Sequence, residues 1–522
     1  MRRVMALLAA VFLCVGIAAS FRYDKNPPAA DAATNGFMEA PATAAAPLPR
    51  QPTAYGINLS TAAYWSKERA FMNLAAGGAW HTVIGSKWSV TPAHRINRFG
   101  TLLALEPGEY AALSLTRPPS SNHGDVAIRC LFKGIGTFSG VNAAEPRLSP
   151  GRFDFIWRRT TNAAFVRVDA TDPADPIRDI DCREADADPK MLFDPAFVDE
   201  LRPYKAVRFM DWMNANQNLG GDWSRRTPPE ATIQAAPHGV ALEHMVALAN
   251  QAGFDPWFVL PWNADAVFLK NFATYVHAKL DPARVAYIEV GNEVWNLDFE
   301  AARQALAEGK RDKLGKDDTE ARMRRYAQRS IDAFKIWEAV FADRPKRIVR
   351  VLSGQNGWPE LLVPALDYKD MVAHIDAVAS APYFGQTVLA QPPADTRDLA
   401  PLFTALHSSI NSTMANARRL KQMADSRGLR FIAYEGGQHL TYRGPDKTLI
   451  ERLNRDPRMG EAYRAYLSLW DREFGDLMVL YYSTSPIGTT MYFGMAEYSG
   501  QPLSETPKRK ALLDAIAGLK AR

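Results

Sequence analysis

Eight short apolar segments recur along the chain, and most of them have polar residues at or near their ends. Several are near-continuous apolar runs, which are typical of strands buried on both faces of a parallel sheet. This feature constrains the fold more than any other. The expected strands are residues 55–59, 207–211, 255–261, 287–293, 347–355, 374–385, 430–437 and 477–486.

Amphipathic helical patterns lie between these segments. Apolar side chains recur at helical spacing on one face of residues 241–251, and residues 320–342 show the same pattern. Strands that alternate with helices indicate βαβ units. Each later gap between strand ends is long enough for one helical crossover. Eight strands joined in this way predict an α/β fold, the (β/α)8 TIM barrel. A doubly wound open sheet is the alternative, because the sequence does not reveal strand order.

The first gap, from Leu59 to Asp211, is far too long for one crossover. It contains short strand-like stretches punctuated by Gly and Pro, which predict a small inserted β-rich module after the first strand. The expected division of the chain is therefore 53–80 and 186–522 for the barrel and 81–185 for the module.

The N-terminus has the pattern of a secretion signal. Arg2 and Arg3 precede an apolar run over 5–19, and small residues follow at the spacing of a cleavage site. Residues 1–20 are therefore expected to be a signal peptide of a secreted or periplasmic protein. An uncleaved anchor is the alternative, although the run is shorter than the ~20 apolar residues of a spanning helix. Residues 21–52 are rich in Ala and Pro and predict a flexible linker. No later stretch predicts a membrane span.

Charge and cysteine content exclude several classes of function. The formal net charge is +5, too weak to indicate nucleic acid as a partner. Cys130 and Cys182 follow the expected signal, and they form either one disulfide or two separate thiols. Neither has histidines at zinc spacing, and the chain lacks a Walker loop, a dinucleotide fingerprint and a Gly-x-Ser-x-Gly elbow. We therefore expect no metal and no cofactor.

Two carboxylates follow apolar strands at corresponding ends. The fourth expected strand ends in Asn292-Glu293, and the seventh ends in Tyr434-Glu435. The carboxyl ends of barrel strands meet at one face, where active sites lie. Two facing carboxyl groups suit glycoside hydrolysis, which needs an acid and a nucleophile or base. The alternatives are a helix-capping role for Glu293 and a tight turn at Glu435.

Asn292-Glu293-Val-Trp295-Asn after the fourth strand, with Glu435-Gly-Gly after the seventh, resembles clan A of the glycoside hydrolases, the retaining (β/α)8 enzymes. The resemblance implies that Glu293 is the acid/base and Glu435 the nucleophile. It implies that Asn292 hydrogen-bonds the sugar 2-hydroxyl. Arg208 matches a strand-end arginine that keeps the nucleophile ionised, and Tyr383 matches a tyrosine that hydrogen-bonds it.

Two positions depart from the clan pattern. Ala381 stands where many members have a histidine, and residues 481–486 contain no tryptophan where many members place one under the sugar. Tryptophans near other strand ends could stack on sugar rings instead. The candidates for such platforms are Trp295, Trp262 and Trp212, with core packing as the alternative.

The sequence therefore predicts an exported retaining glycoside hydrolase that acts on a polysaccharide, either a β-linked glucan or a bacterial exopolysaccharide. A non-catalytic carbohydrate-binding protein, or an envelope polysaccharide assembly subunit on a barrel scaffold, is the alternative. Retention predicts carboxyl groups of Glu293 and Glu435 ~5–5.5 Å apart.

Overall fold

A computed structural model describes residues 48–218, 220–390, 395–442, 444–488 and 492–521. Eight parallel strands form a closed barrel, with each strand paired to the next in chain order and the last paired to the first. Each of the eight expected segments overlaps one of these strands, so the predicted (β/α)8 barrel is confirmed and the open sheet is wrong. The strands are β1 (Ala54–Asn58), β11 (Ala206–Arg208), β12 (Asp255–Leu260), β13 (Ala286–Val290), β14 (Ile348–Ser353), β15 (Ala377–Ser380), β17 (Arg430–Ala433) and β19 (Leu477–Leu480).

The barrel strands are shorter than the sequence pattern suggests. β11 ends at Arg208 and β19 ends at Leu480, and the remaining residues of both expected strands belong to the loops at the mouth. The sixth expected strand is divided. Pro382, which has no N–H to donate, separates β15 from β16 (Tyr383–Phe384), and β16 pairs with β18 (Gly437–Gln438) outside the barrel. This separate pair carries Tyr383 beside Glu435.

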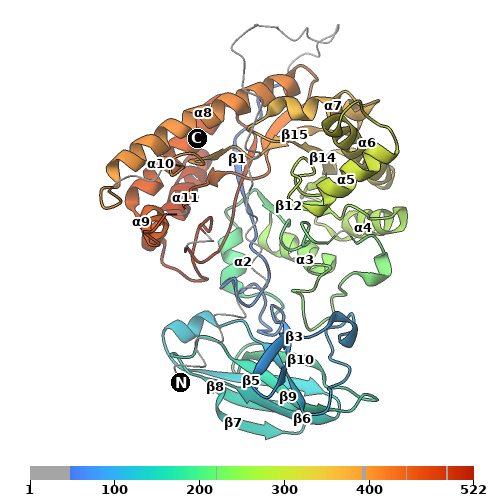
Figure 1. The fold of residues 1–522 in the computed structure, drawn as a ribbon, viewed down its shortest axis with the longest axis vertical. Coiled ribbons are helices and arrows are strands. Elements are labelled where there is room, and N and C mark those ends of the chain that lie inside the picture. The colour runs from blue at the N-terminus through green and yellow to red at the C-terminus, as the bar shows by residue number, and fades with distance from the viewer. Residues whose placement is uncertain (1–47, 219, 391–394, 443, 489–491, 522) are drawn as a thin grey trace.

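Helices surround the barrel (Figure 1). The two predicted helices are present as α3 and α6, and each buries its predicted apolar face. One core cluster fills the space between strands and helices, and a second fills the barrel interior. In the described part of the chain the helices are α2 (Pro195–Leu201), α3 (Leu242–Ala252), α4 (Ala266–Lys279), α5 (Glu300–Arg311), α6 (Asp318–Val340), α7 (Val363–Leu366), α8 (Ala400–Asp425), α9 (Leu449–Arg455), α10 (Pro457–Glu473) and α11 (Pro507–Lys520).

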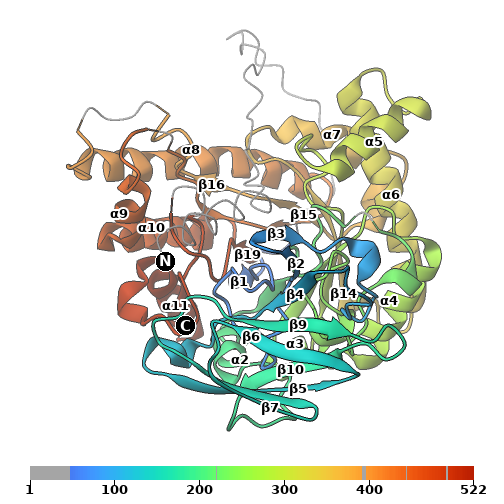
Figure 2. The same cartoon turned by 60° about the horizontal axis from the view of Figure 1, so that its bottom comes forward.

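The strands between β1 and β11 belong to two antiparallel sheets outside the barrel, ordered β3-β2-β4-β9-β6 and β10-β5-β8-β7. Side chains from both sheets, among them Phe138, Phe153 and Val166, form one shared core. Figures 1 and 2 show this β-rich body on one side of the barrel. Its strands are β2 (Trp80–Ile84), β3 (Lys87–Val90), β4 (Glu109–Ser114), β5 (Val126–Lys133), β6 (Gly136–Val141), β7 (Ala144–Ser149), β8 (Arg152–Trp157), β9 (Phe165–Thr171) and β10 (Arg178–Glu184).

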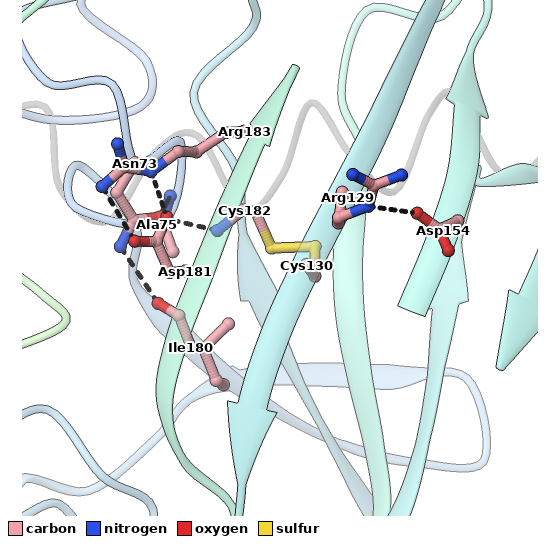
Figure 3. The surroundings of a disulfide bond; sticks show 9 residues. All are labelled: Asn73, Ala75, Arg129, Cys130, Asp154, Ile180, Asp181, Cys182 and Arg183. Carbon is pink, nitrogen blue, oxygen red and sulfur yellow. Dashed lines mark hydrogen bonds and ion pairs between the residues drawn. A yellow bond between two sulfur atoms is a disulfide. The ribbon is translucent and has the colours of Figure 1, made fainter. Parts of the chain in front are cut away.

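Cys130 and Cys182 form a disulfide between β5 and β10, where they face each other in the antiparallel register. The structure therefore favours the disulfide over two separate thiols. Asn73, in the connection from β1 to β2, accepts a hydrogen bond from the Cys182 N–H at 3.0 Å and donates one to the Ile180 carbonyl at 3.0 Å (Figure 3). The connection is thus tied to the strand that carries the disulfide.

Polar contacts join the β-rich body to the barrel. Arg69, which is buried, forms ion pairs with Glu184 at the end of β10 and with Asp194, the N-cap of α2. The Thr232 N–H donates to the Phe99 carbonyl at 3.0 Å across the same boundary. The exact division into domains at residues 81 and 185 stays a prediction.

The expected signal peptide and most of the expected linker lie outside the described residues, which begin at residue 48. Among the helices that the structure describes, none is both long and apolar enough to cross a membrane.

Candidate active site

Glu293 and Glu435 lie at the mouth of the barrel, just beyond β13 and β17, and both are almost fully buried. Glu293 has a φ of 44°, in the left-handed region that few residues other than glycine adopt. Two residues earlier Gly291 has a φ of 64°, and a Cβ there would meet the Val294 side chain at 2.9 Å. This tight backbone turns Glu293 at the strand end.

Arg208 is fully buried at the end of β11, and it hydrogen-bonds residues on or just after three other strands, β1, β13 and β17. One terminal nitrogen, Nη1, donates to Glu435 Oε1 at 2.8 Å and to Asn58 Oδ1 at 3.1 Å. The other, Nη2, donates to Asn292 Oδ1 at 2.8 Å, and Nε donates to Glu289 Oε2 at 3.0 Å. The structure thus brings the predicted arginine onto the predicted nucleophile.

Glu289 is a buried counter-ion of Arg208 within β13. Its Oε2 also accepts from the Trp257 indole N–H at 2.9 Å, and its Oε1 accepts from the Ser353 hydroxyl at 2.6 Å. Because both oxygens are bound by protein donors and the side chain has no exposed surface, Glu289 holds Arg208 in place and does not face a substrate.

Glu435 is held by donors on both oxygens. Arg208 binds Oε1, and the Tyr383 hydroxyl donates to Oε2 at 2.9 Å. Burial raises the pKa of Glu435, and the Arg208 cation and the Tyr383 hydrogen bond offset that rise. These two contacts keep Glu435 the more acidic of the two mouth glutamates.

In the part of the chain that the structure describes, the donors to Glu293 are uncharged. The Tyr434 hydroxyl donates to Oε1 at 3.0 Å, and the Asn296 amide donates to Oε2 at 3.0 Å. Burial, followed by the negative charge of Glu435, raises the pKa of Glu293 to about 8. Glu293 is therefore protonated at neutral pH, as a general acid must be, whereas Glu435 is the mouth glutamate that has a cation against it.

The loop after β11 adds two further residues to the mouth. Asn216 Oδ1 accepts from the Asn292 side-chain amide at 2.9 Å, so both ends of the Asn292 amide are fixed by protein contacts. Asp211 is half-buried, and burial followed by the charge of Glu435 raises its pKa to about 7. In the sequence, Asp211 ends the second expected strand and opens the polar loop 211–217, which is a candidate for hydrogen bonds to sugar hydroxyls, with an ordinary loop as the alternative.

Aromatic side chains border Tyr383 at the mouth. The Tyr481 ring lies 6.4 Å from it, the His439 ring lies 5.4 Å from it, and Phe493 lies 5.3 Å from Tyr481. Burial lowers the pKa of His439 to about 4, so its imidazole is neutral at neutral pH. Tyr481 directly follows the last barrel strand, where the clan pattern has a tryptophan. This position in the sequence could have identified Tyr481 as a residue of the mouth.

Two of the three predicted tryptophan platforms are wrong. Trp212 and Trp262 are each 1% exposed and belong to the core between barrel and helices. Trp212 stacks on Phe71 at 5.5 Å and on Phe197 at 6.2 Å, which leaves no face for a sugar. Both rings are therefore part of the packed core and do not offer a surface to a ligand. Trp295 is half-buried, and its role as a platform stays a prediction.

A cavity of about 360 Å³ lies outside the mouth, between the loop after β11 and helices α3 and α4. Met213, Leu242 and Phe268 line its apolar part, and Arg225 and His238 line its polar part. Neither Glu293 nor Glu435 lines this cavity.

No protein-family model matches the chain, and no curated protein matches it. The similar solved structures include a GH51 arabinofuranosidase from Xanthomonas axonopodis pv. citri, 10% identical, with 61% of this chain and 64% of that chain covered and a TM-score of 0.38. A Bacteroidetes-affiliated GH5 cellulase is 13% identical over 62% of this chain and 89% of its own, with a TM-score of 0.36. A β-glucosidase from Thermotoga maritima is 13% identical over 61% and 84%, with a TM-score of 0.35.

The chain covers less than two thirds of the arabinofuranosidase, and identities this low concern the fold alone. The function is therefore argued from the residues of this chain. Its closed eight-stranded barrel, with a glutamate after β13 and another after β17, is consistent with the expected resemblance to clan A glycoside hydrolases.

Proposed function

We propose that the protein is an exported retaining glycoside hydrolase that cleaves a polysaccharide by double displacement. The unlike surroundings of the two mouth glutamates carry this proposal. Glu435 contacts a cation, Arg208, whereas the donors to Glu293 among the described residues are neutral. A binding protein has no need of two buried carboxyl groups in such different surroundings, but general acid and nucleophilic catalysis need both.

In the first step the Glu435 carboxylate attacks the anomeric carbon while Glu293 gives its proton to the departing glycosidic oxygen. The C–O bond to the leaving sugar breaks, and a glycosyl ester forms on Glu435. Arg208 and Tyr383 hold both oxygens of Glu435 and so orient the carboxylate before attack. In the second step the ionised Glu293 takes a proton from water, and the resulting hydroxide displaces Glu435 from the sugar.

Asn292 is the residue proposed to bind the sugar 2-hydroxyl. Its side-chain oxygen is bound by Arg208 and its nitrogen by Asn216, so the amide cannot rotate freely. The hydrogen bond from Asn292 to the 2-hydroxyl should strengthen as the oxocarbenium-like state forms. Because the Asn292 side chain is already fixed, it loses little conformational entropy when it makes that bond.

A β-linked glucan or a bacterial exopolysaccharide is the proposed substrate, and the proposed location is outside the cytoplasm. The pattern of residues 1–20 supports export, and the half-buried aromatic side chains Tyr481 and Phe493 at the mouth suit the apolar faces of sugar rings.

The test is product analysis of the wild-type protein on a panel of β-glucans and bacterial exopolysaccharides, together with azide rescue of two variants. Glu293→Ala should retain the first step on substrates with good leaving groups, and azide should restore turnover with formation of a β-glycosyl azide from a β-glycoside. Glu435→Gly should be inactive, and azide should give the inverted α-glycosyl azide.

The reverse pattern, with the β-azide from Glu435→Gly and the α-azide from Glu293→Ala, would show that the two roles are exchanged. A wild-type protein that binds a glycan of the panel tightly and releases no product from any of them would favour the carbohydrate-binding alternative.

A further inference from the structure

We propose that Tyr434 is a positioning residue for the acid/base: it holds Glu293 and sets the pH at which Glu293 gives up its proton. Its role in turnover rests on the proposed function, whereas its effect on the proton of Glu293 does not. Tyr434 is adjacent in sequence to the proposed nucleophile Glu435, yet its hydroxyl reaches the other catalytic carboxyl group.

The contact is built from fixed parts. Tyr434 has no exposed surface and lies beyond the end of β17, where its N–H donates to the Ser380 carbonyl at 3.0 Å. The Asn58 amide donates to the Tyr434 carbonyl at 3.0 Å. With the backbone held on both sides, the phenol crosses the mouth and its hydroxyl donates to Glu293 Oε1 at 3.0 Å. The short stretch that follows β17 therefore carries Glu435 and also holds Glu293.

Several ionisable groups face this contact from the neighbouring strands. The Arg208 guanidinium lies 4.9 Å from the centre of the Tyr434 ring, on the side of β11. The groups that act electrostatically on Glu293 or Tyr434 are Arg208, Glu289, Glu435, Tyr383 and Tyr481. No cation binds Glu293 directly within the described residues. Asn296 and Tyr434 are accordingly the groups that stabilise its anion by direct contact, and the Arg208 cation adds a smaller attraction without a contact.

This arrangement matters in both chemical steps. When Glu293 passes its proton to the glycosidic oxygen, a negative charge remains on its carboxylate. The Tyr434 hydroxyl stabilises that charge, because a hydrogen bond to a charged acceptor is stronger than one to a neutral acceptor. Without this donor, Glu293 is a weaker acid in the first step and a stronger base in the second.

Tyr434→Phe removes the hydroxyl and keeps the ring against Arg208. One hydrogen bond to a buried charged group corresponds to about one pKa unit, so the proton affinity of Glu293 should rise roughly tenfold. In turnover the alkaline limb of the pH profile of kcat/KM should move to higher pH by about one unit. The rate with poor leaving groups should fall, because they depend on the acid, and the rate with activated aryl glycosides should change little.

The test measures protonation without substrate. Protein labelled with carbon-13 at the glutamate side-chain carboxyl is titrated by NMR, and the Glu293 signal is identified by its loss in Glu293→Gln. Ordinary glutamates titrate near their usual pKa of about 4.3 and stay constant above neutral pH. Glu68 is a buried exception, with a pKa raised to about 7, and is identified by Glu68→Gln.

We expect Tyr434→Phe to raise the Glu293 midpoint by about one unit. Tyr55→Phe is the matched control, because it removes a buried hydroxyl that donates to the Leu467 carbonyl at 2.9 Å, and it should leave the midpoint unchanged. If Tyr434→Phe does not fold, 3,5-difluorotyrosine at position 434, a stronger donor, should lower the midpoint.

An unchanged midpoint in a folded Tyr434→Phe protein, or a rise with difluorotyrosine, would overturn the proposal. The proposed function fails separately: a protein that cleaves no glycan of the panel can still show the shift in the Glu293 midpoint. In that case Tyr434 would tune a buried carboxyl group that has another purpose.

Discussion

Replacing Arg208 by methionine removes the cation that two buried carboxylates share. Arg208 and Glu289 have no exposed surface, and Glu435 is 5% exposed, so water cannot take over the role of the guanidinium. Breaking a buried ion pair by removing one partner costs about 3–5 kcal/mol, because the remaining charge is left unpaired. Asn58 and Asn292 lose donors as well, which places Arg208→Met at the upper end of that range.

The loss should depend on pH in a definite direction. Without Arg208, the pKa of Glu435 in the folded protein lies further above its unfolded value. A group with a raised acid pKa binds more protons in the folded state, so its unfavourable effect on stability grows as pH rises above the unfolded pKa. The difference in unfolding free energy between wild type and Arg208→Met should therefore be smaller at about pH 5.5 than at about pH 8.

Urea denaturation followed by tryptophan fluorescence at these two pH values measures both effects. Arg419→Met is the control, because Arg419 pairs with Glu360 at the exposed surface and such pairs contribute at most about 1 kcal/mol. A loss below about 1 kcal/mol for Arg208→Met at the higher pH, or a larger loss at the lower pH, would refute the account of Arg208 as a shared buried counter-ion.

Three further changes have defined outcomes. Tyr383→Phe removes a donor to Glu435 and so raises the pKa of Glu435, which should move the acid limb of kcat/KM to higher pH while the alkaline limb stays in place. Replacing Cys130 and Cys182 by serine opens a loop that spans 52 residues, and the chain-entropy relation predicts a loss of about 4 kcal/mol in urea unfolding of the β-rich body. Trp262→Ala should lower the urea midpoint, at a cost of about 3–5 kcal/mol, and leave the affinity for glycans unchanged once the protein is folded.

The barrel could be predicted because its strands carry their own signal. Runs such as 255–261 and 287–293 are largely apolar along their length, and 287–293 ends in Asn292 and Glu293. The same pattern predicted Glu293 and Glu435 at one rim of the barrel. In the structure both lie at the mouth, where Arg208 and Tyr383 bind Glu435 and where Tyr434 and Asn296 bind Glu293. The disulfide could be predicted only as one of two possibilities, because sequence does not reveal that Cys130 and Cys182 face each other across two strands.

Contacts across the mouth could not be predicted, because they depend on how the strands close. Tyr434 and Glu293 are 141 residues apart, and only the closed order of β13 through β17 lets the phenol reach that carboxyl group. The prediction of Trp212 and Trp262 as sugar platforms was wrong for a related reason. A ring after a strand can turn to the cleft or to the helices, and the loop path decides which. Trp212 and Trp262 turn to the helices.

The central claim is that Glu435 forms a covalent bond to the sugar while Glu293 handles the proton. Mass spectrometry of Glu293→Ala, quenched during reaction with an activated aryl glycoside that the wild-type protein hydrolyses, tests this claim most directly. The account predicts protein heavier by one glycosyl residue, with the added mass on the peptide that contains Glu435. A reaction that releases the aryl group without such an adduct, or an adduct located elsewhere in the chain, would contradict it.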